Sequence, residues 1–411
     1  MPRESPFTFA FPSPAEALAA LVAHIRPVET QSIALEDSPG RILAQPIIAD
    51  RPSPAVDVSS MDGYAVRVAD VTTAELKIAG EVRIGREPPV LPPDACLRIV
   101  TGGAIPLGAD AVIKREDVTE HPDRILLRRD TRVQSGQNIR RAAENVVAGA
   151  RVIDGGLRIT PTITAALAAF GVASPIVHRR VRVAILTTGD EVVPPAAQPT
   201  RWQLRDSNAP ALRALLHPLP FIDFQHTHIP DDESAMHGAI AHALASFDAL
   251  LLTGGVSMGH RDFVADALAA NGLRTLFHGL PQRPGKPLLG GITADGRPVL
   301  ALPGNPVSVM VTARRIALPA ILARAGLRGM GILPMCLGPI SASVVYITNP
   351  DAKSTDLWWH RLVRLTSPGN AELIDSKSSG DLVGAARADG FIELPPHLTG
   401  PGPWPFYPWT P

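Results

Sequence analysis

Residues 251–262 read LLTGGVSMGHRD, and this stretch decides the fold class of the chain. Its apolar start predicts a buried strand that runs into the turn Thr253-Gly254-Gly255, and residues 264–270 predict a helix directly after Asp262. A glycine turn between a strand and a helix lets unpaired backbone N–H groups approach an anion. The spacing is neither GxGxxG nor GxxxxGK[ST], which argues against a dinucleotide-binding turn or a P-loop. A plain tight connection is the alternative interpretation of such a turn taken alone.

Two similar turns flank this stretch and favour the anion site. Residues 181–186 (VRVAIL) predict a strand buried on both faces that ends at Thr188-Gly189-Asp190-Glu191, and residues 299–302 predict one that ends at Pro303-Gly304-Asn305. Strands predicted at 221–229 and 248–253 alternate with helices predicted at 209–216 and 233–244. This alternation predicts an open, largely parallel α/β sheet with helices on both faces. All three turns fall at carboxyl ends of strands, where such sheets bind ligands.

The rest of the chain predicts three further parts around an α/β domain at 179–326. Amphipathic and Ala-rich helices at 13–25 and 161–170 predict an N-terminal helical, partly extended linker domain made of residues 1–50 and 136–178. Short strands predict a β-rich insert domain at 51–135, and alternating stretches after residue 326 predict a small C-terminal β-domain at 327–411. Because prolines lack the ladder donor, the tail at 404–411 is expected to be an extended arm and not a central strand.

Composition narrows the class of protein. The 411 residues hold 39 basic and 39 acidic side chains, which argues against nucleic acid or an anionic membrane as the main partner. Cys96 and Cys336 form no CxxC motif, so neither a disulfide framework nor a structural zinc site is expected. No signal-peptide pattern and no uninterrupted apolar run of spanning length is seen. We therefore expect a cytoplasmic enzyme or binding protein.

The residue types near the turns point to a phosphorylated or oxyanionic ligand. Carboxylates beside glycine turns suit a magnesium ion that bridges such a ligand, because magnesium takes one or two carboxylates together with substrate oxygens. The acids are Asp190, Glu191, Asp232 and Asp262. Arg283 and Lys286, on the stiff loop RPGKP, are suited to bind an oxyanion. Each acid taken singly is more typical of a helix cap or a solvated surface group than of a ligand, and Asp232 in particular is equally typical of an acid in the first turn of a helix. The isolated His360 is expected to have a structural role.

The order of the motifs resembles one family. They are MDGYA at 61–65, TGG at 101–103 with GADAV at 108–112, TGDE at 188–191, TGGVS at 253–257 with Gly259 and Asp262, PGKP at 284–287 and LPGNPVS at 302–308. This series resembles the MoeA family of molybdopterin molybdenumtransferases, to which the C-terminal domain of gephyrin is related. The resemblance covers roughly residues 10–325 and is weaker beyond, and the α/β segment resembles the MogA/MoaB molybdopterin-binding fold.

The resemblance implies an activity and a set of site residues. Members of the family insert molybdenum from molybdate into adenylylated molybdopterin and release AMP in a magnesium-dependent reaction. By resemblance the catalytic residues are Asp62, Thr101, Glu191, Asp232 and Asp262, of which Glu191 and Asp262 would hold the metal. The substrate-binding residues would be Thr188, Gly189, Asp190, Thr253, Gly254, Gly255, Ser257, Arg283, Lys286, Pro303, Gly304, Asn305, Arg361 and Ser379. The family also implies a homodimer in which Asp62 and Thr101 reach the active site of the second subunit, and a MogA-type partner enzyme.

Three departures from the family pattern bear on this assignment. A family acid falls on Asn145, where the carboxylate is lost, and of two family lysines one falls on Gly279 and the other on Arg283. Residues 330–355 fit no family pattern, although SSG at 378–380 and ADG at 388–390 support the register that places Arg361 and Ser379 near molybdate.

Two other functions stay open on the sequence. A carrier or scaffold that binds molybdopterin without inserting metal is favoured by the lost acid and the divergent C-terminus. A CinA-like nucleotide hydrolase shares the MogA-like fold, but the MDGYA and LPGNPVS motifs argue against it.

Overall fold

The computed structural model describes residues 9–72, 74–255, 263–328 and 344–409, and it separates into two compact units. Unit 1 comprises residues 1–45, 155–165 and 173–411, and unit 2 comprises residues 46–154 and 166–172. The predicted division into four domains is finer than these two units and stays a prediction.

The core of unit 1 is a six-stranded sheet in the order β16-β13-β17-β21-β20-β18. The strands are β13 (Val181–Thr188), β16 (Ile222–Ile229), β17 (Ala249–Thr253), β18 (Arg274–His278), β20 (Leu289–Ile292) and β21 (Pro298–Leu302). The first four in this order pair in parallel, and β20 and β18 add an antiparallel edge. The prediction of a largely parallel sheet is confirmed.

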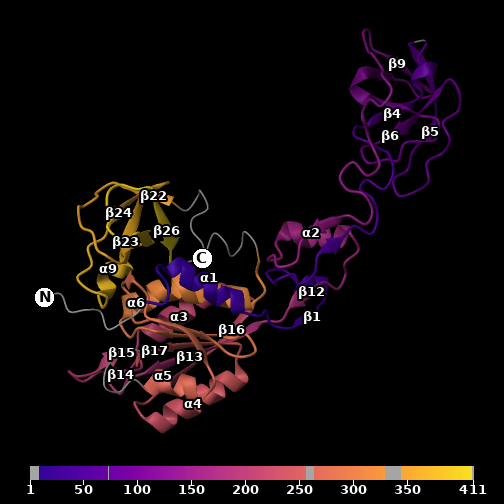
Figure 1. Cartoon of the computed structure of the whole chain (residues 1–411). Coiled ribbons are helices and arrows are strands. Elements are labelled where there is room, and N and C mark those ends of the chain that lie inside the picture. Colours follow the sequence, from indigo (N-terminus) through magenta and orange to yellow (C-terminus); the bar gives the residue numbers. More distant parts are fainter. Residues whose placement is uncertain (1–8, 73, 256–262, 329–343, 410–411) are drawn as a thin grey trace. The chain divides into compact units, whose positions relative to one another are not determined.

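Helices cover both faces of this sheet (Figure 1). On one face lie α1 (Pro14–His24), α3 (Asn208–Leu216), α6 (Pro306–Thr312) and α7 (Leu318–Arg324), and on the other lie α4 (Glu233–Ser246) and α5 (Phe263–Ala270). Helix α1 begins as predicted, because the Ser13 hydroxyl accepts from the Glu16 N–H and Pro14 occupies the first helical position. The apolar sides of these helices fill two separate cores against the buried strands.

One continuous helical run, Pro306–Arg324, passes through the first of these cores. A π-helical stretch, Ala313–Ala317, joins α6 to α7. Pro319, in the first turn of α7, has no N–H to donate to the carbonyl of Arg315. Among the described residues this is the one helix whose 19 residues and mean hydropathy of 1.4 would allow it to cross a membrane, but 89% of its most apolar stretch is buried inside the protein. Its hydropathy therefore fits a core helix.

The C-terminal part of unit 1 is a small closed β-barrel (Figure 1). Its strands are β22 (Val344–Ile347), β23 (Trp358–Ser367), β24 (Asn370–Leu373), β25 (Gly390–Leu394) and β26 (Trp404–Pro408), with the short helix α9 (Leu382–Ala386). The order β23-β24-β22-β26-β25 closes because β25 also pairs with β23. The predicted small β-domain is confirmed as a barrel.

The prediction that the tail is an extended arm is wrong. Strand β26 lies between β22 and β25 and completes the barrel. Each of its paired residues contacts one neighbouring strand only: Pro405 pairs with β22, and Pro408 pairs with β25. Each proline therefore removes a single donor and does not interrupt a ladder on both sides. Burial of Tyr407, which stacks on Phe391 at 5.1 Å, favours this placement.

A short strand of the α/β part also joins the barrel. Strand β19 (Gln282–Arg283) pairs in parallel with the start of β23, and the Trp358 N–H donates to the Pro281 carbonyl at 2.8 Å. Backbone hydrogen bonds therefore fix the loop after Arg283 against the barrel.

Unit 2 contains a second six-stranded sheet in the order β7-β4-β6-β5-β9-β8. Its strands are β4 (Gly63–Val66), β5 (Glu75–Glu81), β6 (Ala95–Ile99), β7 (Ala111–Lys114), β8 (Val118–Glu120) and β9 (Arg124–Leu127). The apolar residues on its two sides form two small cores, one of which includes the buried Cys96. These strands confirm that the insert is β-rich.

Shorter elements accompany the two sheets and the barrel. Strand β1 (Thr30–Ser32) pairs with β12 (Ile176–His178), β2 (Ile47–Ile48) with β11 (Arg151–Ile153), β3 (Val58–Ser59) with β10 (Ile139–Arg140) and β14 (Val192–Val193) with β15 (Leu204–Arg205). The predicted Ala-rich helix is α2 (Pro161–Ala169).

Candidate functional site

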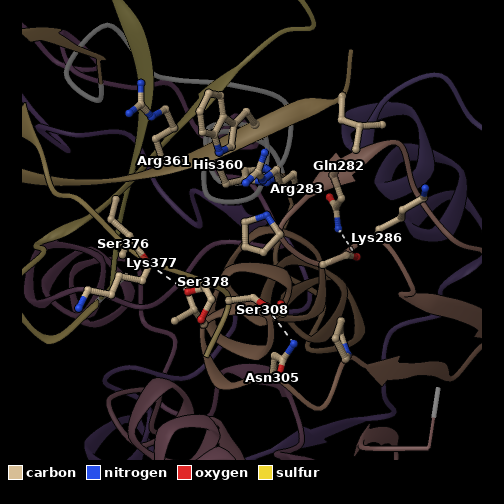
Figure 2. Close-up of a pocket in the computed structure, with 18 of the residues that line it drawn as sticks. Gln282, Arg283, Lys286, Asn305, Ser308, His360, Arg361, Ser376, Lys377 and Ser378 are labelled. Carbon is tan, nitrogen blue, oxygen red and sulfur yellow. Dashed lines mark hydrogen bonds between the residues drawn. The ribbon is translucent and has the colours of Figure 1, made fainter. Parts of the chain in front are cut away.

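A cavity of about 710 Å³ lies between the α/β part of unit 1 and its barrel (Figure 2). Two segments of the α/β part line it: residues 282–287, from β19 and the following loop, and residues 303–308, from the turn after β21 and the start of α6. Two segments of the barrel region complete it: residues 353–362, which lead into β23 and form its start, and residues 374–379, from the loop after β24. The cations on these segments are Arg283, Lys286, Lys353, Arg361 and Lys377. A concave site with several converging cations is suited to a polyanionic ligand.

The loop after β19 carries two of these cations, as predicted. Gly285 has a φ of +94°, and a Cβ there would collide with the Thr312 side chain, so the loop requires glycine at this position. Gln282 closes the loop, since its Nε2 donates to the Gly285 carbonyl at 3.0 Å. The Arg283 guanidinium lies 5.2 Å from the centre of the Trp359 ring, and Lys286 lies 5.6 Å from that of Phe9. The loop is thereby packed with both cations at the cavity.

Arg361 comes from the barrel, and its charge is paired. Its two terminal nitrogens donate to the two carboxylate oxygens of Asp351 at 2.5 and 2.8 Å. Its guanidinium also lies 4.4 Å from the centre of the Trp359 ring, so this ring contacts both Arg283 and Arg361. The pKa of Asp351 is lowered to about 2, first by its hydrogen bonds to Arg361.

Ser379 and Asn305 connect the two sides of the cavity. The Asn305 Nδ2 donates to the Ser379 Oγ at 2.9 Å, and the Val307 N–H donates to the Ser379 carbonyl at 3.0 Å. Helix α6 therefore begins against the loop that carries Ser379. The structure brings Arg283, Lys286, Asn305, Arg361 and Ser379 to the same cavity.

The glycine turns lie at the carboxyl end of the sheet. Gly254 and Gly255 have φ values of +94° and +65°, and a Cβ on Gly254 would collide with the Thr188 Oγ1, so the turn approaches β13 closely. The Asn208 Nδ2 donates to the Gly304 carbonyl at 2.9 Å. This bond helps to hold the turn at 303–305 beside the turn at 253–255. The predicted set Thr188, Gly189, Thr253, Gly254, Gly255, Pro303 and Gly304 thus gathers along this edge. Ser257 and Asp262 lie outside the described residues.

The predicted acids have local structural roles as well as a place near this edge. The Asp232 carboxylate caps α4 by accepting from the Ala235 N–H at 2.8 Å. Asp232 therefore does have the helix-capping role that the sequence offered as its alternative. Asp190 and Asp231 bond each other's backbone N–H groups at 3.1 and 3.4 Å. Glu191 is exposed, and its carboxylate lies close to Gly189. The catalytic roles of Glu191 and Asp232 stay predictions.

The acids near the sheet edge are candidate ligands for a metal ion. Among the described residues there is no cluster of three or more His, Cys, Asp or Glu that could hold one. Magnesium needs only one or two carboxylates with ligand oxygens and water, so a magnesium site at this edge stays a prediction. Exposed Glu191 is suited to be one of these carboxylates.

Asp62 and Thr101, which lie in unit 2, contact each other. The Thr101 N–H and hydroxyl donate to the Asp62 Oδ1 at 2.7 and 2.8 Å, and these two bonds lower the pKa of Asp62. The carboxylate is therefore held ionised in a fixed orientation, with its other oxygen available. This pair was predicted only as two separate motif residues.

The departures from the family pattern have local explanations. Asn145 accepts from Arg140 at 2.7 Å and donates to the Ser53 hydroxyl at 3.2 Å, while Glu144 bonds Arg140 and the Arg141 N–H. Gly279 has a φ of +96°, a conformation that a lysine rarely adopts.

Sequence reasoning missed several cavity residues. Lys353, Trp359 and Lys377 line the cavity, but no motif included them. Lys377 could have been found from its position directly before SSG at 378–380. Lys353 could not, because it lies in the stretch that fits no family pattern.

Comparison with known proteins relates both halves of the chain to one pathway. Residues 12–171 match the family described as the MoeA N-terminal region (domain I and II), and residues 184–323 match the one described as a probable molybdopterin binding domain. The molybdopterin molybdenumtransferase of Synechococcus elongatus is 38% identical over 321 residues, which cover 75% of this chain and 78% of the relative. That of Synechocystis sp. is 28% identical, over 97% of this chain and the whole relative. The crystal structure of the molybdopterin biosynthesis MoeA protein from Pyrococcus horikoshii OT3 superposes with a TM-score of 0.77 at 25% identity, covering 96% of this chain and 98% of that one.

Proposed function

The chain belongs to the MoeA family of molybdopterin molybdenumtransferases, and from this premise we propose that it inserts molybdenum from molybdate into adenylylated molybdopterin, with magnesium-dependent release of AMP. The observation that carries the proposal is the cavity, where cations of the α/β part and of the barrel converge beside the glycine turns. Molybdate is a small tetrahedral dianion, so several convergent cations and hydroxyl groups can bind it.

In this proposal molybdate binds between Arg283, Lys286, Arg361 and Ser379. Arg283 supplies a planar fork of N–H donors, and Lys286 supplies a point charge on the same loop. The Ser379 hydroxyl accepts one bond from Asn305 and keeps its own proton to donate to an oxyanion. These groups hold the dianion next to the sheet edge, where the second substrate binds.

Adenylylated molybdopterin binds along the glycine turns in this proposal. Backbone N–H groups near Gly189, Gly254 and Gly255 can donate to its pyrophosphate, because glycine lets the chain approach without a Cβ. Thr188, Asp190, Thr253, Ser257, Pro303, Gly304 and Asn305 would complete the binding surface. The juxtaposition of these turns and the cation-lined cavity would place the dithiolene sulfurs within reach of molybdate.

Glu191, together with Asp262, would hold a magnesium ion against the pyrophosphate. Bound magnesium would neutralise charge on the phosphate oxygens and favour loss of AMP. Asp232 would act from its position at the start of α4, where its carboxylate is fixed by the cap to Ala235. Asp62, held by Thr101, would complete the active site of the second subunit in a homodimer.

The wider setting of the reaction belongs to the same proposal. A MogA-type enzyme that adenylylates molybdopterin would supply the substrate, and the reaction would take place in the cytoplasm. Nucleic acid and membranes are not expected partners, because the acidic and basic residues are equal in number.

One assay tests the proposed activity. The purified chain is mixed with adenylylated molybdopterin, molybdate and magnesium, and released AMP and active cofactor are measured. We expect AMP release that depends on molybdate, with loss of activity in Glu191→Ala and Asp262→Ala proteins that remain folded by circular dichroism. AMP release indifferent to molybdate would instead indicate a hydrolase, and substrate binding without turnover would indicate a carrier.

A second experiment tests the shared site. Asp62→Ala and Asp262→Ala subunits, each inactive alone, are combined in heterodimers that are purified by two affinity tags. If each active site uses both subunits, one intact site forms per heterodimer, and about half the wild-type activity should return. Confirmed heterodimers without activity would contradict this geometry.

A further inference from the structure

Arg361 differs from the other cations of the cavity because a carboxylate of the chain already occupies its two terminal nitrogens. Asp351 accepts from both in a bidentate pair. In the described part of the chain, Arg283 and Lys377, which also line the cavity, have no such ion pair. Asp351 therefore covers the hydrogen-bonding end of Arg361, and the cavity as a whole stays positively charged.

The pair is built so that the carboxylate can leave and the arginine cannot. The Arg361 side chain is 10% exposed and stacks on Trp359, whereas the Asp351 side chain is 30% exposed. Figure 2 shows the Arg361 guanidinium turned away from Asn305 and Ser308, on the far side of the cavity. The end of the arginine that could bind an oxyanion bidentately is thus the end that Asp351 covers.

Asp351 also has a second cationic partner, Lys353. Its carboxylate accepts from the Lys353 N–H at 3.2 Å, and the Lys353 ammonium lies 3.7 Å away. A carboxylate displaced from Arg361 would stay near Lys353 and would not be left without a counter-ion. Both residues belong to the stretch 330–355, which fits no family pattern.

We propose that Asp351 is a specificity-determining residue that keeps Arg361 in a closed ion pair, which the substrate oxyanion must open before Arg361 binds it. This inference rests on the proposed function of the cavity. A tetrahedral dianion can replace both bonds to Asp351 and still present charge to Arg283 and Lys286. A monoanion that replaces the two bonds has no second charge to offer, so Asp351 selects dianions over monoanions.

The test measures binding of inorganic molybdate to the full chain by isothermal titration calorimetry. Asp351→Asn keeps the shape of the side chain and the bond to the Lys353 N–H but removes the charge, and it should tighten molybdate binding about tenfold, as expected for release of a bidentate charged pair. Nitrate, used as a monoanionic competitor, should compete with molybdate in this variant and not in the wild type. Weaker or unchanged molybdate binding, or equal competition by nitrate in both proteins, would overturn the proposal.

Asp375→Asn is the matched control, since Asp375 lines the same cavity and its removal changes the net charge equally. An equal gain in this control would show a general charge effect and would also overturn the proposal. Arg361→Ala separates this inference from the proposed function. If Arg361→Ala weakens binding while Asp351→Asn does not tighten it, the inference alone fails. If Arg361→Ala binds molybdate like the wild type, Arg361 does not bind the oxyanion and the inference fails; if Arg283→Ala also binds like the wild type, the cavity is not the oxyanion site and the proposed function fails with it. In an Arg361→Ala background, Asp351→Asn should have no further effect.

Discussion

His360 and Arg361 are neighbours on β23 and both line the cavity, yet their side chains pair with carboxylates in two different environments. The His360 side chain lies on the face that packs against α6, where its Nε2 donates to the Glu393 carboxylate at 3.0 Å, and Arg315 pairs with the same carboxylate at 2.7 Å. Arg361 lies on the other face, where it pairs with Asp351 beside the cavity. Successive side chains of a strand point to opposite faces, so one strand serves both regions.

The difference between the two carboxylates lies in their access to water. The Arg315 and Glu393 side chains are 1% and 6% exposed, so neither charge can be solvated if the other is lost. Burial would raise the pKa of Glu393, but Arg315 and His360 outweigh it and lower that pKa to about 2. Asp351 can exchange its partner for water or another cation. The two arginine–carboxylate pairs therefore differ in role. The buried Arg315–Glu393 pair holds the barrel against the helices, whereas the more exposed Asp351 controls access of an anion to Arg361.

The largest expected effect is on stability, when the buried pair is broken. Glu393→Ala removes the carboxylate that pairs with the buried Arg315 and should lower the free energy of unfolding by about 3–5 kcal/mol, measured by urea denaturation. Asp351→Ala, the control on the exposed side, should cost about 1 kcal/mol or less. Similar losses in the two variants would show that the regions do not differ in the way described.

The dependence of stability on pH should show a smaller effect of the same kind. The folded-state pKa of Glu393 is below its ordinary value of 4.5, so its contribution is complete above pH 4.5 and is lost as the pH falls toward about 2. The difference in unfolding free energy between wild type and Glu393→Gln should therefore shrink between about pH 6 and pH 3, by an amount on the order of 2 kcal/mol. A difference that is constant over this range would contradict the assignment.

The smallest expected effect concerns a single hydrogen bond across the cavity. Ser379→Ala removes the acceptor of Asn305 but leaves the backbone bond from Val307, so it should cost about 1 kcal/mol or less in stability and weaken molybdate binding roughly two- to fivefold. Ser376→Ala is a suitable comparison, because the Ser376 hydroxyl bonds within its own loop to the Ser378 carbonyl at 3.0 Å. Equal weakening by both variants would argue that the link between the cavity sides has no special role.

Much of the α/β part could be predicted from the sequence, since its signals are local. A doubly buried strand such as 181–188, a capped helix such as the one after Ser13 and a glycine turn each follow from a short stretch of residues. The set of residues at the sheet edge followed, because carboxyl ends of parallel strands must lie together.

The rest depends on pairings between distant residues, which no local pattern indicates. The prolines of the tail predict an arm because Pro405 and Pro408 lack donors, yet closure of the barrel gives each of them a single paired neighbour. The Asp351–Arg361 pair could not be predicted either, since the two residues belong to different segments of the barrel region and contact only after it forms. The resemblance to the family predicts molybdate as the partner of Arg361, and no part of the sequence indicates its ion pair with Asp351.

The pairing of β19 with β23 has a consequence for how the sequence can vary over evolution. Backbone hydrogen bonds, such as that from the Trp358 N–H to the Pro281 carbonyl, do not depend on which side chains are present. The loop after Arg283 is therefore aligned with Arg361 by the main chain itself. Substitutions in the barrel, including the stretch around Asp351, therefore need not change the spacing of the two arginines across Trp359. Such an arrangement allows the ligand preference of the cavity to be retuned without rebuilding the cavity.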